Sequence, residues 1–178
     1  MATWTGRGLR GSNLEEFINR TLDKYRSQNL ALIQKIPTPI TPIDIEKDTK
    51  HITLAYFDKK STVDYIGVVQ GIPVCFDAKE CAKASFQISN IHEHQFNFME
   101  DFEKQQGISF IIIFFTRENR MFYMPMTQIK KFYQRAQNGG RKSITFDEVV
   151  EGSYEIILDR AGFVPFLDCL QKDLLTRD

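Results

Sequence analysis

The sequence predicts an α/β domain in which helices flank a mixed β-sheet. The segment 108–116, ISFIIIFFT, is almost unbroken in its apolar character, as expected of a strand that is covered on both faces. A 3.6-residue repeat of apolar side chains predicts a helix over 14–28. The residues of this repeat are Leu14, Phe17, Ile18, Leu22 and Tyr25. A chain of 178 residues that is 42% apolar is long enough to bury a core as one domain, which we expect to span 12–178.

The remaining elements follow from the same periodicities and from turn residues. The first helix opens with a capping-box pattern, Ser12 followed three residues later by Glu15. Strands are expected at 30–36, 52–57, 64–69, 72–78, 108–116, 121–124 and 154–158. Further helices are expected from His92 to near Gly107, from a cap at Thr127 to Gln137, over 147–151 and over 164–175.

A proline-bounded excursion follows the first predicted strand and includes the second. The stretch PTPITP at 37–42 is expected to be extended and to lack ladder donors, because proline has no backbone N–H. A charged turn at 44–50 follows, and the chain then returns through 52–57. We expect 37–60 to project as a stalk, and connections of this length are often functional.

Composition excludes several classes of protein. The first residues, MATWTGRGLRGS, lack the apolar core of a signal peptide and instead predict a flexible basic arm over 1–11. No apolar run is long enough to cross a bilayer, so we expect a cytoplasmic protein without a membrane partner. Three cysteines are an odd number without framework spacing, which favours reduced thiols.

The net charge is zero, but the charges are unevenly distributed. The middle of the chain is basic, with Glu118 as its one acid, and the segment after Ser143 is acidic. The basic residues of the middle segment are Arg117, Arg120, Lys130, Lys131, Arg135, Arg141 and Lys142. Such a segment can present a phosphate-binding face. An ordinary solvated surface is the alternative.

Two carboxylates face each other in a predicted hairpin. If Gln70-Gly71 forms the turn, Val69 opposes Ile72 and Asp64 opposes Asp77. Like charges in directly opposed positions are destabilising, so a cation is expected between them. Lys79 lies two residues after Asp77 and therefore on the same face of the strand. The pattern favours a metal-dependent phosphoryl-transfer site. The alternative is a surface ion pair between Asp77 and Lys79, with Asp64 capping the strand.

Other candidate sites are weaker. Cys75, Cys81, His92 and His94 do not have the ligand spacing of zinc sites, and the two histidines would diverge by about 200° on a helix. Cys75 is expected in the core. Two acids, Glu15 and Glu16, lie in the first turn of the first helix, where we expect them to cap the helix and to interact favourably with its dipole.

Six segments together resemble a known family. In chain order they are RGSNLEEFIN, KIPTPI, STVDYIGV, PVCFDAKE, FQISNIHEHQ and NGGRKSI. Their sequences and spacings resemble the RecU-type Holliday-junction resolvases, which belong to the restriction-endonuclease-like PD-(D/E)xK nucleases. The similarity runs from about Arg10 to the C-terminus.

The resemblance implies a restriction-endonuclease-like fold and a Mg²⁺-dependent homodimer, with Mn²⁺ as a substitute metal. Such an enzyme makes paired nicks in four-way junction DNA during recombination and repair, with recombination proteins as further partners. The resemblance makes Asp64 and Asp77 metal ligands, which Thr62 and Gln95 complete, and gives Lys79 the role of stabilising the transition state. It also implies that Glu15 or Glu16 is a further acid of the catalytic site. The stalk would enter the centre of the DNA junction. The DNA contacts it favours are Arg7, Arg10, Arg117, Arg120, Lys130, Lys131, Arg141 and Lys142.

The chain departs from the family pattern in three ways, one of which is a slightly longer loop at Asn138-Gly139-Gly140. The family usually has Glu where this chain has Asp77, and its members tend to be basic where this chain is neutral. Two alternatives therefore remain beside the resolvase. One is a nuclease of the same superfamily that cuts linear or flap DNA, and the other is a non-catalytic DNA-binding module. The projecting stalk favours the junction, and the intact acids and lysine favour catalysis.

Overall fold

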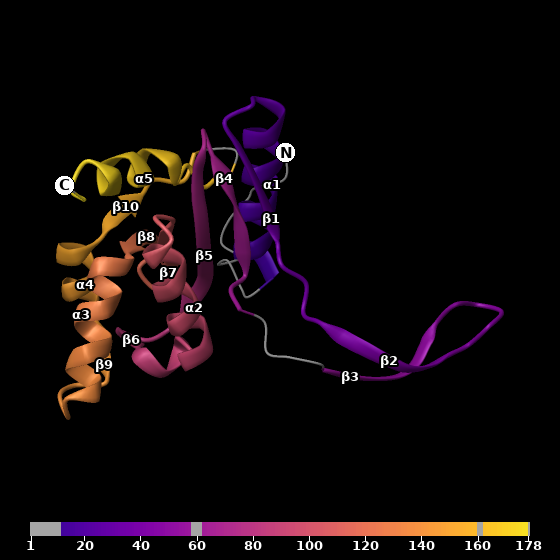
Figure 1. Ribbon diagram of the computed structural model, residues 1–178. Helices are drawn as coiled ribbons and strands as arrows, with labels where there is room; N and C mark the ends of the chain where they lie inside the picture. The colour runs from indigo at the N-terminus through magenta and orange to yellow at the C-terminus, as the bar shows by residue number, and fades with distance from the viewer. Residues whose placement is uncertain (1–11, 58–61, 160–161, 178) are drawn as a thin grey trace, which may run out of the picture.

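A mixed six-stranded sheet forms the centre of the protein. The computed structural model describes residues 12–57, 62–159 and 162–177. The strands lie in the order β1 (Ala31–Lys35), β4 (Tyr65–Val69), β5 (Ile72–Cys81), β7 (Ile108–Phe115), β8 (Arg120–Pro125) and β10 (Tyr154–Ile156). The pair β5–β7 is parallel and the other neighbours are antiparallel. The expected mixed α/β architecture is confirmed (Figure 1).

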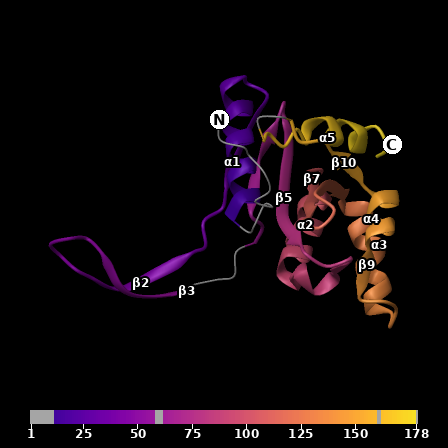
Figure 2. The ribbon, with the colours of Figure 1, turned by 180° about the vertical axis from the view of Figure 1, so that it is seen from behind.

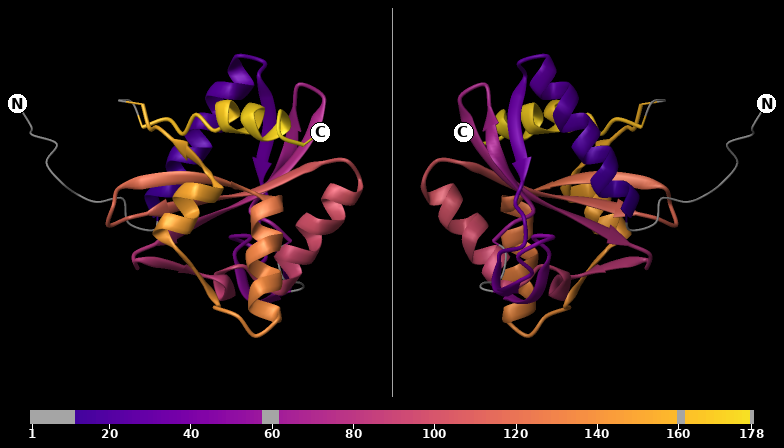
Figure 3. Two further views of the ribbon diagram at one scale, coloured as in Figure 1. Left: turned by 90° about the vertical axis from the view of Figure 1, so that its left-hand side faces the viewer. Right: turned by 90° about the vertical axis from the view of Figure 1, so that its right-hand side faces the viewer.

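Helices cover both faces of this sheet and form two cores. On one face lie α1 (Ser12–Ser27) and α5 (Leu167–Leu174), which bury Ile18 and Leu170 with the even-numbered residues of β7. On the other face lie α2 (Glu93–Lys104), α3 (Met126–Gln137) and α4 (Phe146–Gly152). Figure 3 shows α1 and α5 on one side of the strands and α2 and α3 on the other. All eight residues of β7 are buried, as its apolar run predicted.

A two-stranded ribbon projects from this body. It consists of β2 (Ile40–Ile45) and β3 (Ile52–Phe57), which pair with each other and with no strand of the central sheet (Figures 1 and 2). The stalk prediction is thus confirmed for the described residues, and 58–60 lie outside them. The segment 37–42 was expected to be extended and to lack ladder donors at its prolines, and Ile40 to Pro42 nevertheless pair with β3. The ladder shifts register after Pro42, and such a shift is common where proline removes a donor.

Two helix starts also differ from the prediction. Pro125 is the N-cap of α3, which begins at Met126, so Thr127 already lies inside the helix and does not cap it. The last helix begins at Leu167 rather than at 164. The backbone N–H of Val164 donates to Thr21 Oγ1 of α1 (2.8 Å), which holds the preceding segment against α1 outside any helix. The side chain of Ser12 lies outside the described part, so its capping box stays a prediction.

A second two-stranded ladder, besides the ribbon, was not predicted. The strands β6 (Ser85–Gln87) and β9 (Ser143–Thr145) pair antiparallel, and a 3₁₀ turn, η1 (Ile88–Asn90), leads on toward α2. Each strand has three residues, which is too short for a periodic signal in the sequence. Among the described residues, no helix has both the length and the apolar character needed to cross a membrane.

Candidate active site

The β4–β5 hairpin has the predicted register. Tyr65 pairs with Phe76 and Val69 with Ile72. The turn residues Gln70 and Gly71 have φ values of 48° and 88°, and positive φ at both central positions is what a type I′ hairpin turn requires. The chain therefore reverses where the sequence indicated, and Asp64 stands beside Asp77.

Each carboxylate is held by the backbone of the neighbouring segment. The Asp64 N–H donates to Asp77 Oδ1 at 2.7 Å, and the Ala78 N–H donates to Asp64 Oδ2 at 3.2 Å. These two hydrogen bonds are reciprocal, so neither acid can swing away without breaking one of them. The arrangement leaves Asp77 Oδ2 without a hydrogen-bond donor among the described residues.

Lys79 supplies the expected cation. Its Nζ lies 3.2 Å from Asp77 Oδ2 and 3.8 Å from Asp64 Oδ2. The alternative of a surface ion pair between Asp77 and Lys79 is wrong for Asp77, because this residue is completely buried. Burial raises the pKa of Asp77 above its ordinary value of 3.8, the Lys79 ammonium opposes the rise, and the Asp64 carboxylate adds to it. The fold thus tolerates a buried acid that ordinary packing would avoid.

The two acids, Asp64 and Asp77, lie on the face of the sheet that α2 covers. Asp77 is the register partner of Ile111, and both Ile111 and the alternate strand residues Cys75 and Cys81 belong to the core under α2. Burial raises the pKa of the Cys75 thiol, as expected of a core cysteine rather than a reactive one.

Thr62 and Gln95 are less closely joined to the acids. Thr62 is exposed in the segment before Asp64. Gln95 is 5% exposed in the first turn of α2, and its Oε1 accepts the backbone N–H of His92 at 3.2 Å. In the described residues, no hydrogen bond links Thr62 or Gln95 to Asp64 or Asp77. Their role as metal ligands stays a prediction from the family resemblance.

The two acids of α1 are in different surroundings. Glu15 forms an ion pair with Lys35 at the end of β1, whereas Glu16 forms one with Arg20 of its own helix. Lys35 is the register partner of Tyr65, the residue after Asp64. Burial raises the pKa of Tyr65, and the charges of Glu15 and Asp64 both add to that rise. Glu15 is therefore tied to the β1–β4 edge of the central sheet, whereas Glu16 is paired within its own helix. Lys35 was missed because the pairing of β1 with β4 cannot be read from the sequence.

The zinc alternative gains no support from the structure. His92 is the N-cap of α2 and lies outside the helix, so the expected divergence from His94 is wrong, and the two rings stack at 5.4 Å. Within 12–57, 62–159 and 162–177, no group of three or more His, Cys, Asp or Glu side chains is placed to hold a metal.

Several predicted DNA-contacting residues are engaged in ion pairs. Arg120 donates two hydrogen bonds to Glu155 (2.8 and 2.7 Å), and Lys130 lies 3.6 Å from Glu100. Arg141 and Arg135 share Glu148, and these contacts lower the pKa of that acid to about 2. By contrast, Arg117, Lys131 and Lys142 are exposed and form no ion pair with any described residue. Arg7 and Arg10 lie outside the described residues.

Comparison with known proteins identifies a family. The family model described as "RecU: Recombination protein U" matches residues 9–172. The chain is 40% identical to the Holliday junction resolvase RecU of Pediococcus pentosaceus over 169 residues, which are 93% of this chain and 84% of the relative. It is 37% identical to that of Lactococcus lactis, over 93% of this chain and 78% of the relative.

A solved structure also matches, that of Hjc, a Holliday junction resolvase from Archaeoglobus fulgidus. The TM-score is 0.49 with 7% identity, over 82% of this chain and 95% of that one. The family assignment is independent of this weak match. From the extent of the family model and the identity to its members, this chain belongs to the RecU family.

Proposed function

We propose that the chain is a Holliday junction resolvase, an endonuclease that introduces paired nicks in four-way DNA during recombination and repair. The observation that carries the proposal is the buried Asp77, which faces Asp64 and has Lys79 between the two acids. Membership of a family whose relatives bear the name Holliday junction resolvase supports it.

The residues present fit a divalent metal ion. Asp77 Oδ2 is buried and receives no backbone hydrogen bond from a described residue, and the cation beside it is the Lys79 ammonium, so it has a lone pair to offer. Mg²⁺ prefers oxygen ligands and is usually bound through one or two carboxylates, with waters and phosphate oxygens filling its remaining positions. Asp64 and Asp77 would supply the carboxylates, and Thr62 and Gln95 further oxygens. Bound Mg²⁺ or Mn²⁺ would acidify a water and offset charge on the phosphate.

The chain's own residues would position the metal-binding carboxylates and stabilise the charge that develops on the phosphate. The reciprocal backbone hydrogen bonds fix both carboxylates before substrate arrives, which lowers the cost of organising the site. Lys79 is a compact point charge, and its side chain is 19% exposed, so it can reach a phosphate while remaining near the acids. There it would stabilise the negative charge that grows on the phosphate oxygens as the bond breaks.

The β2–β3 ribbon supports a junction as substrate. A projection of this kind has a place to enter at the open centre of a four-way junction and none in a continuous duplex. Two symmetric nicks require two sites, and the described residues contain one such arrangement of acids and lysine. We therefore include a homodimer in the proposal, with a cytoplasmic location and recombination proteins as partners.

The test compares substrates at equal concentration: a synthetic four-way junction, a linear duplex and a flapped duplex, each with Mg²⁺, Mn²⁺ or EDTA. We expect symmetric nicks on the junction with either metal and none with EDTA. Equal cutting of the linear or flapped duplex would instead indicate a general nuclease. Tight junction binding without cutting in either metal would indicate a DNA-binding module.

A further inference from the structure

The strand β1 forms an open edge of the central sheet. Its sequence is ALIQK, it pairs with β4 on one side, and no described strand pairs with its other side. The backbone N–H and C=O groups on that side are available for another strand. Edge strands are commonly protected by a charged side chain, but the single charged residue of β1, Lys35, is ion-paired with Glu15. The edge is therefore suited to strand addition.

An apolar row crosses the sheet at this edge. Leu32 of β1 pairs with Val68 of β4, and Val68 pairs with Pro73 of β5, so the three side chains lie in line on one face. Leu32 is 56% exposed and Val68 37% exposed, and Pro73 is exposed as well. These residues leave an apolar surface that the helices of that face do not cover.

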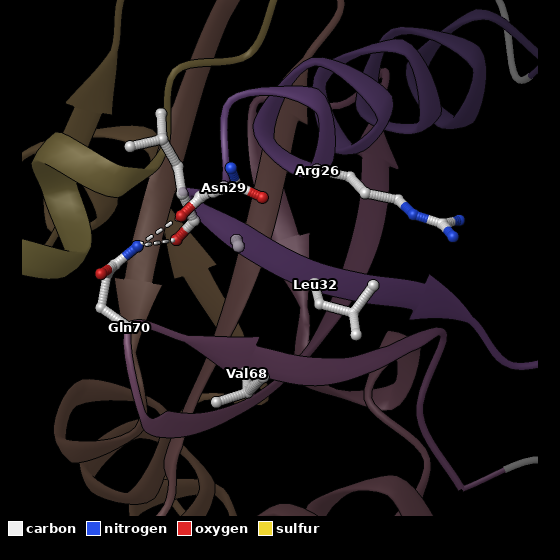
Figure 4. A pocket seen from close by; sticks show the side chains of 7 residues that line it. Arg26, Asn29, Leu32, Val68 and Gln70 are labelled. Atoms are coloured by element: carbon white, nitrogen blue, oxygen red, sulfur yellow. Dashed lines mark hydrogen bonds between the residues drawn. The ribbon is translucent and has the colours of Figure 1, made fainter.

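A recess of about 490 Å³ lies over this region, with Leu30, Leu32, Val68 and Arg26 among its lining residues (Figure 4). The shape of the recess is fixed by Gln70, whose Nε2 donates to the carbonyl oxygens of Asn29 (2.6 Å) and Leu30 (3.2 Å). These bonds tie the tip of the β4–β5 hairpin to the start of β1.

The charge at the recess indicates which partner it fits. Arg26 is exposed, and it lies on the side of β1 opposite to Val68 (Figure 4). Among the described residues it forms no ion pair. A ligand with a carboxylate beside apolar side chains would satisfy both Arg26 and the apolar row. A second copy of β1 would not, since ALIQK has no acid and would bring a further lysine.

We propose that the open edge of β1 binds an extended, acidic segment of another protein, which adds to the sheet as a further strand. Main-chain hydrogen bonds to β1 would supply affinity, apolar side chains would pack beside Leu32, and a carboxylate would pair with Arg26. This site is distinct from the acid pair and would recruit a partner without taking part in DNA cleavage.

The test uses four synthetic peptides, acetyl-Glu-Xaa-Thr-Xaa-Glu-amide, in which both Xaa are Val, Ile, Leu or Phe, and their Gln-for-Glu counterparts. The full isotope-labelled chain is titrated to millimolar peptide and followed by its backbone amide signals. We expect saturable shifts at Ala31 to Lys35 with at least one acidic peptide, and weaker binding of its neutral counterpart. No shift of these amides with any peptide, or equal binding of acidic and neutral peptides, would overturn the proposal.

Matched variants locate the binding. Arg26→Glu should weaken it by about tenfold, since an attraction becomes a repulsion. Leu32→Glu should abolish it. Lys172→Glu and Leu175→Glu, which alter exposed residues near the C-terminus, should leave it unchanged. All four variants should nick junctions as the wild type does, which separates this site from the proposed nuclease site. Equal weakening by Arg26→Glu and Lys172→Glu would contradict the proposal.

Two further outcomes would reassign the edge. Self-association that Leu32→Glu removes, measured by sedimentation, would assign it to a second copy of the chain. Shifts of the β1 amides by duplex DNA, but not by peptide, would assign it to nucleic acid. Either result would overturn the proposal.

Discussion

At the scale of single residues, the site is built on an acid in an unfavourable position. Asp77 is fully buried, faces a second carboxylate and is compensated by one lysine. Functional sites commonly contain such costly groups, and removing them often stabilises a protein while ending its activity. The shorter Asp in place of the Glu usual in the family still reaches the backbone N–H of Asp64 and Lys79.

This cost predicts a pH-dependent gain in stability for Asp77→Asn. Because burial raises the pKa of Asp77 in the folded state, the folded protein binds more protons than the unfolded chain between pH 3.8 and the raised pKa. The contribution of the Asp77 carboxyl to the wild-type free energy of unfolding is therefore fully present below pH 3.8, and it is lost as the pH rises through the raised pKa. In thermal unfolding with EDTA, Asp77→Asn should have a higher melting temperature than the wild type at pH 7. The difference between the two melting temperatures should shrink as the pH falls toward 4.

The neighbouring Asp64→Asn serves as the control, since its side chain is 29% exposed and has less to gain from losing its charge. An Asp77→Asn variant that is less stable than wild type at pH 7 would indicate that the carboxylate stabilises the fold.

At the scale of elements, a buried polar network fastens α5 to the sheet and to α2. Arg177 donates to both carboxylate oxygens of Asp173 (3.0 and 2.9 Å) and to Glu103 Oε1 of α2 (3.0 Å). Tyr123 of β8 donates to Asp173 at 2.8 Å, and Ser109 of β7 donates to Glu103 at 3.1 Å. The network around Arg177 thus joins four elements, namely α5, α2, β7 and β8.

Arg177→Met should therefore be costly. It would leave Asp173, whose side chain is 2% exposed, and Glu103, at 15%, without their shared cation. Breaking a buried ion pair in this way typically costs about 3 kcal/mol or more. Urea unfolding measures the loss. The matched Lys172→Met, at an exposed lysine of α5, should change the unfolding free energy by less than about 0.5 kcal/mol. Equal effects of the two changes would contradict the network's importance.

Local patterns predicted some elements well and missed others for physical reasons. The β4–β5 register could be predicted because a two-residue turn determines it, and with it the meeting of Asp64, Asp77 and Lys79. The start of α5 could not, because a contact with Thr21, far away in sequence, holds Val164 outside the helix.

The same distinction applies to charges. The sequence shows where basic residues cluster, but the partners of Arg120 and Lys130, namely Glu155 and Glu100, are distant in sequence. The ion pair between Glu15 and Lys35 depends likewise on the fold, which brings β1 next to the first helix. Side chains that meet through tertiary packing carried no local signal.

At the scale of the whole molecule, the β2–β3 ribbon and the central sheet are separate structures, and the proposed function gives them separate tasks. The ribbon pairs with no strand of the sheet and exposes Ile43, Leu54 and Tyr56 by more than half of their surface. Replacing 40–57 by a short Gly-Ser linker should leave the melting temperature of the body unchanged. The ratio of junction nicking to linear-duplex nicking should fall, since the selective element is gone.

The control for that experiment is a variant with the same linker in place of the exposed turn Asn138 to Gly140, away from the ribbon. A shortened ribbon that retains full junction preference would show that selectivity resides elsewhere in the protein.

The most direct measurement of the central claim is junction nicking by wild type and Asp77→Asn in Mg²⁺, with junction binding measured in parallel in EDTA. We expect paired nicks from the wild type, loss of nicking in the variant by at least about a hundredfold, and binding that is equal or tighter, since a negative charge near the phosphates is removed. A folded Asp77→Asn that nicks junctions at the wild-type rate would contradict the account of the site.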